Sequence, residues 1–141
     1  MPILLSLGFH LKLAGLTLLF LGVSHAFFDR RFQWREELSR VSLLNRQIFY
    51  VHTFFVALVV FLIGALCLFG TRGLIERTFA GACLSGALCF FWLCRLVCQF
   101  LVYSSELWRG KRLETFMHWL FTLAWTYYSA VFGWAFWGQI H

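Results

Sequence analysis

Charged residues and proline are both scarce in this sequence. Only 13% of the 141 residues are charged and 61% are hydrophobic, which is far from the composition of a soluble domain. The single proline is Pro2, so proline introduces no kink further along the chain. This composition argues against a water-soluble protein and favours one that is solvated by lipid.

Paired metal and redox motifs are absent as well. None of the five cysteines has CxxC spacing, and all lie in apolar stretches, where a thiol behaves as a small hydrophobic group. No HExxH motif occurs. The first ten residues carry no Lys or Arg, unlike a secretory leader, so we interpret the first apolar stretch as a membrane span.

Four apolar stretches account for most of the chain. Each is long enough to cross a hydrocarbon core of about 30 Å as an α-helix, the structure that satisfies its own backbone in lipid. They cover residues 7–28, 48–70, 78–103 and 115–138. We therefore predict an all-α fold, an integral membrane four-helix bundle in which residues 1–141 form a single domain.

Basic residues are concentrated in two of the three connections. Residues 29–46 hold five arginines, and the connection between the third and fourth stretches holds Arg109, Lys111 and Arg112. The positive-inside rule places both connections in the cytoplasm and both termini outside it, and we expect a bacterial inner membrane. The net charge of +6 then indicates anionic lipids as partners and argues against nucleic acid.

The first connection has a helical pattern of its own. Trp34, Leu38 and Val41 recur at helical spacing, which predicts a short interfacial helix between the first and second spans. Glu37 lies beside this stripe. It either points under the bundle or is a solvated carboxylate of the connection.

Small residues indicate where helices meet. Gly8, Gly15 and Gly22 repeat every seven residues in the first span, and Gly81 and Ser85 have small-xxx-small spacing in the third. These residues predict packing faces, which serve contacts within one chain, a homo-oligomer or a larger membrane complex equally well.

Each predicted span carries a polar group at a similar height. His25, His52 and His118 each lie about one helical turn from the span end next to a basic connection, and the third span offers Gln99 there and Arg95 one turn deeper. His118 also begins a polar stripe with a period of three to four residues, through Thr122, Thr126 and Ser129. We expect this polar level to hold any chemistry the protein performs.

Arg95 is the most informative of these residues. A guanidinium in the middle of a span costs about 2.5–3.5 kcal/mol on insertion scales. Burial against Glu37, Asp29 or an anionic ligand would offset this cost. The alternative is that Arg95 reaches the lipid phosphates and only anchors its helix.

The three histidines admit two interpretations. Imidazole binds iron, copper and zinc, so His25, His52 and His118 are candidate ligands of haem b or of a transition metal. Arg95 or Arg46 could then neutralise haem propionates, and Glu37 or Asp29 could complete a non-haem site. The other interpretation is that each histidine makes interhelical hydrogen bonds.

The stretch that follows the first span reads His25-Ala-Phe-Phe-Asp29-Arg-Arg. In chain length and span number the protein resembles the small bacterial membrane-bound protoporphyrinogen oxidases, which are haem proteins. The Leu-Pro-Arg turn of that family is absent after the first span, and the third span has no lysine. The resemblance is therefore architectural, and it assigns no role to any residue.

Three functions fit these features. The first is a haem or metal protein with an electron-transfer or redox role near the cytoplasmic face, in which the histidine cluster holds the cofactor. The second is a non-catalytic structural or assembly subunit of a larger membrane complex. The third is binding of anionic lipid headgroups by Arg95 and Arg46.

Overall fold

A computed structural model describes residues 6–141, and within this range the chain is helical and has no β-strand. Pro2 lies outside the described residues. The helices, in order, are α1 (Leu7–Ser24), η2 (His25–Phe27), α2 (Phe28–Arg31), α3 (Trp34–Glu37), η3 (Leu38–Arg40), α4 (Leu43–Phe69), α5 (Thr71–Ile75), α6 (Phe79–Leu101), η4 (Ser105–Leu107) and α7 (Arg112–Ile140). The predicted all-helical fold is confirmed.

The long helices agree with the predicted apolar stretches, and capping side chains explain where two of them begin. Ser42 precedes α4 and its hydroxyl accepts a hydrogen bond from the Asn45 amide, while Thr78 caps α6 through the Gly81 amide. Such caps satisfy amides that have no partner inside the helix. The Ser42 cap lets α4 begin five residues before the predicted span.

Three of these helical segments are long and apolar enough to cross a membrane, namely Leu7–Arg31, Leu43–Phe69 and Phe79–Leu101. This is consistent with a membrane protein. Helix α7 is the longest, at 29 residues, but it is not among the three. Its histidine, threonines, serine, tyrosines and tryptophans lower its mean hydropathy, so the fourth crossing stays a prediction.

The connection between α1 and α4 forms short helical turns and is not one continuous helix. Gln33 separates α2 from α3 with a left-handed backbone, φ 52°. The helical turns end at Arg40, and Val41 is extended. Trp34 and Leu38 therefore lie on helical turns as expected, whereas Val41 does not continue their stripe.

The described chain divides into two compact units. Unit 1 comprises residues 6–11 and 72–141, and unit 2 comprises residues 12–71. The single domain expected from the sequence stays a prediction.

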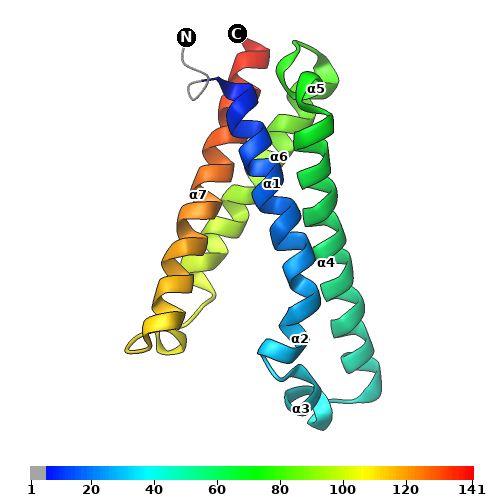
Figure 1. Cartoon of the computed structure of the whole chain (residues 1–141), viewed down its shortest axis with the longest axis vertical. Helices are drawn as coiled ribbons and strands as arrows, with labels where there is room; N and C mark the ends of the chain where they lie inside the picture. Colours follow the sequence, from blue (N-terminus) through cyan, green and yellow to red (C-terminus); the bar gives the residue numbers. More distant parts are fainter. Residues whose placement is uncertain (1–5) are drawn as a thin grey trace. The chain divides into compact units, whose positions relative to one another are not determined.

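In unit 2, α1 and α4 lie side by side (Figure 1) and approach closely at glycines. A Cβ on Gly15 would lie 2.9 Å from the Gly64 carbonyl oxygen, and a Cβ on Gly22 would lie 3.0 Å from the Phe61 Cβ. A side chain at Gly15 would require α4 to shift, and one at Gly22 would press on Phe61, so the predicted packing role of Gly15 and Gly22 is confirmed.

In unit 1, α6 packs along α7 (Figure 1). A Cβ on Gly81 would lie 2.5 Å from Oε1 of Gln139 of α7, whose amide donates a 3.4 Å hydrogen bond to the Ser85 hydroxyl of α6. Trp92 of α6 stacks on Trp125 of α7 with 5.1 Å between ring centroids. A buried aromatic layer and a side-chain amide therefore join the two helices.

Candidate functional site

The end of α1, the turns that follow it and residues of α4 as far as Phe61 line an open groove of about 540 Å³ in unit 2. We call it the His25 groove. Its walls are mostly apolar and include Ala57, Leu58 and Phe61, and Asp29 and Tyr50 lie at one end. The volume is within the range of about 300–1,000 Å³ that is typical of small-molecule and cofactor sites.

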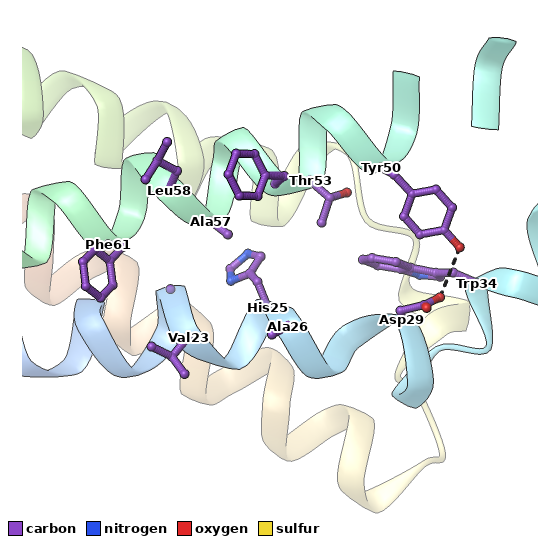
Figure 2. A pocket seen from close by; sticks show the side chains of 12 residues that line it. Val23, His25, Ala26, Asp29, Trp34, Tyr50, Thr53, Ala57, Leu58 and Phe61 are labelled. Carbon is purple, nitrogen blue, oxygen red and sulfur yellow. Dashed lines mark hydrogen bonds between the residues drawn. The ribbon is translucent and has the colours of Figure 1, made fainter. Parts of the chain in front are cut away.

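His25 points from the α1 side of this groove toward α4 (Figure 2). Its Nδ1 lies 2.7 Å from the Leu21 carbonyl oxygen. A carbonyl oxygen only accepts, so Nδ1 carries a proton, and in the neutral imidazole Nε2 then has the lone pair. The ring also packs on Phe28, with 4.6 Å between centroids. A histidine oriented in this way can ligate a metal or accept a hydrogen bond through Nε2.

The polar end of the groove carries charges of both signs. The Tyr50 hydroxyl donates to Oδ1 of Asp29 over 3.2 Å (Figure 2). Arg35 and Arg46 lie within electrostatic range of that hydroxyl. Asp29 was a candidate to complete a non-haem site with the histidines; in the structure its hydrogen bond is with Tyr50, and the backbone of α1 orients the His25 imidazole.

His52 also belongs to unit 2 but does not line the groove. Its side chain is exposed, and Nδ1 lies 2.9 Å from the Ile48 carbonyl oxygen of its own helix. Glu37 is exposed on α3. The structure therefore brings Asp29 and Arg46 toward the His25 groove and leaves His52 and Glu37 outside its lining.

His118 belongs to a buried cluster in unit 1. The Gln99 Oε1 accepts from the Arg95 guanidinium and from the Trp125 indole, both at 3.3 Å. Because these two groups can only donate, Oε1 must face them, and Nε2 of Gln99 then donates to Nδ1 of His118 over 3.0 Å. A neutral His118 therefore carries its proton on Nε2. We call these four residues the Gln99 cluster.

Aromatic rings surround the Gln99 cluster. Trp108 stacks on His118 at 4.5 Å and 15°, and the Arg95 guanidinium lies 4.9 Å from the centroid of the Trp125 ring. The guanidinium is also 5.5 Å from the Tyr103 ring. Gln99 and His118 are buried, with 5% and 9% of their surface exposed.

The histidines are thus divided between the units, with His25 and His52 in unit 2 and His118 in unit 1. Among residues 6–141, no group of three or more His, Cys, Asp or Glu side chains gathers where it could hold a metal ion. Comparisons with family models, curated proteins and solved structures find no match. Any function is therefore inferred from the chemistry of the His25 groove and the Gln99 cluster.

The sequence did not reveal the partners that complete these sites. Trp125 was not among the predicted site residues, yet it is buried and donates to Gln99. The burial of Trp125 could have been predicted from the sequence, because helical spacing places it on the same stripe of α7 as His118, Thr122 and Ser129. All three of those residues are buried. No local pattern could connect Tyr50 to Asp29, which is 21 residues away in the chain.

Proposed function

We propose that this protein is a small four-span membrane protein that binds haem b in the His25 groove, where His25 would hold the haem iron, and that it has a role in electron transfer or redox chemistry. The observation that carries the proposal is that His25 turns Nδ1 to the Leu21 carbonyl oxygen in a mostly apolar groove of about 540 Å³, which leaves Nε2 of the neutral imidazole free to bind a metal. Bound haem would supply one-electron chemistry, and the protein would supply orientation and charge.

The surroundings of His25 suit a flat apolar group with an anionic edge. Ala57, Leu58 and Phe61 offer apolar contact. Arg35 and Arg46 act at the Tyr50 end of the groove, where their charges could balance propionates as well as the Asp29 carboxylate. His118 is left out of the proposed ligand set, because its protonated Nε2 has no lone pair.

The test is an absorption spectrum of the full chain, expressed with ample haem precursor and purified in mild detergent. We expect a Soret band and one haem per chain. His25→Gly should remove the band, and added imidazole should restore it, because a free imidazole can occupy the space of the lost ring. His52→Ala is the matched control, since His52 makes the same bond to its own helix but does not line the groove.

A wild-type protein with no Soret band and no stoichiometric metal by mass spectrometry would contradict the proposal. Copurification of such a protein with partner chains would favour the assembly-subunit alternative. Equal loss of haem from the His52→Ala and His25→Gly variants would contradict the assignment of His25.

A further inference from the structure

Arg95 is the only charged residue of α6. It lies six residues before Leu101, the last residue of that helix, which is about 9 Å along the axis. Its guanidinium extends toward this end, because it donates to Gln99 one turn ahead and lies near the Tyr103 ring. The positive charge is therefore within a side chain's reach of the end of the helix.

The protein provides few acceptors for this guanidinium. Arginine has five N–H groups, and the one hydrogen bond resolved for Arg95 is shared with a second donor at Oε1 of Gln99. Among the described residues the one ion pair formed is Arg72 with Glu76, so no carboxylate there neutralises Arg95. The rings of Trp125 and Tyr103 hold the cation in place without accepting its N–H protons.

Two indoles add further unused donors. In the described part of the chain, the buried side-chain nitrogens without a hydrogen-bond partner are Nε1 of Trp92 and Nε1 of Trp108. Trp92 stacks on Trp125, and Trp108 stacks on His118, so both adjoin the Gln99 cluster. A buried donor without an acceptor is costly. The Arg95 guanidinium therefore has no anionic partner, and two indole N–H groups near it have no acceptor.

We propose that unit 1 binds a phosphate group at Arg95, carried by a phospholipid headgroup or present as the free ion. Phosphate oxygens accept hydrogen bonds and bring negative charge, so they would supply the anionic partner that Arg95 lacks and acceptors for its remaining N–H groups. Arginine suits this role because its planar fork engages two phosphate oxygens at once. This site is distinct from the His25 groove and does not depend on haem.

The test uses the detergent-purified full chain and three probes. These are a short-chain phosphatidylglycerol, the diacylglycerol with the same acyl chains, and inorganic phosphate. Tryptophan fluorescence reports binding at the rings beside Arg95, and the thermal midpoint reports stabilisation. We expect a saturable response to phosphatidylglycerol and none to diacylglycerol. A matching response to inorganic phosphate would identify the free ion as a ligand, and its absence would identify the lipid headgroup.

Substitutions then localise the site. Arg95→Gln should weaken binding of the responding probe about tenfold or more, as expected for the loss of a charge-assisted hydrogen bond. Arg95→Lys should also bind more weakly although it keeps the charge, and it serves as the test variant if Arg95→Gln fails to fold. Arg72→Gln is the matched control, because Arg72 is exposed and paired with Glu76.

Two results would overturn the proposal. One is that neither phosphate probe binds the wild-type protein. The other is that Arg95→Lys, with unchanged helical circular dichroism, binds as tightly as the wild type.

Discussion

At the scale of single residues, hydrogen bonding distinguishes the histidines from one another. His25 and His52 each face the carbonyl oxygen of the residue four positions earlier in the chain, whereas His118 faces a side-chain amide from another helix. In their neutral forms His25 and His52 have a lone pair on Nε2, whereas His118 has a proton there. Their positions in the sequence did not distinguish the three histidines as candidate ligands. Their hydrogen-bond partners do, because the partners determine which ring nitrogen is protonated.

A substitution of Gln99 tests its part in the hydrogen bonds of the Gln99 cluster. Gln99→Leu should lower the free energy of unfolding by about 1–3 kcal/mol, because Trp125 loses its acceptor and His118 loses its donor inside a buried cluster. Unfolding of the purified protein, followed by circular dichroism, measures the change. Gln47→Leu is the control, since Gln47 is exposed. Equal stability of the two variants would contradict the role given to Gln99.

At the scale of helices, α1 and α4 depend on glycines that leave room for the facing backbone. A Cβ on Gly15 would lie 2.9 Å from the Gly64 carbonyl oxygen and a Cβ on Gly64 would lie 2.8 Å from the Leu19 amide nitrogen, and backbone moves less readily than a side chain. The seven-residue glycine repeat predicted such a face in α1, because small residues let helices approach in lipid. The same repeat could not identify α4 as the partner, since every other span also carries small residues.

Gly15→Ala therefore tests the packing of unit 2. The added Cβ would lie 2.9 Å from the Gly64 oxygen, so we expect a loss of about 1–3 kcal/mol through overpacking. The thermal or denaturant midpoint of the purified protein measures it. Gly138→Ala provides the matched change in α7, where a Cβ would meet nothing within 4 Å. Destabilisation by Gly138→Ala alone would contradict this explanation.

At the scale of the whole molecule, three helical segments meet the length and hydropathy expected of a membrane span, and α7 has the length only. Thr122 and Ser129 of α7 are buried and donate to carbonyl oxygens of their own helix. Such bonds satisfy polar groups that hydropathy counts as costly. For this reason we keep a fourth crossing in the proposal.

Reporter fusions test that crossing. With four spans, a periplasmic-type reporter after His141 should be active, and the same reporter inserted at Ser105 should be inactive, because the positive-inside rule places that basic connection in the cytoplasm. Insertion at Ser39 should match insertion at Ser105. The same reporter activity at Ser105 and after His141 would show that α7 does not cross.

The sequence by itself determined the helical class, the approximate extents of the long helices and the glycine face of α1. These properties depend on hydropathy and spacing within one segment, so they can be read locally. Tertiary structure decided the partners of Asp29, Gln99, Trp108 and Trp125. Those contacts join residues that are distant in the chain, and helical spacing sets the face of a side chain but not the group opposite it. The His25 groove and the Gln99 cluster both arise from such contacts.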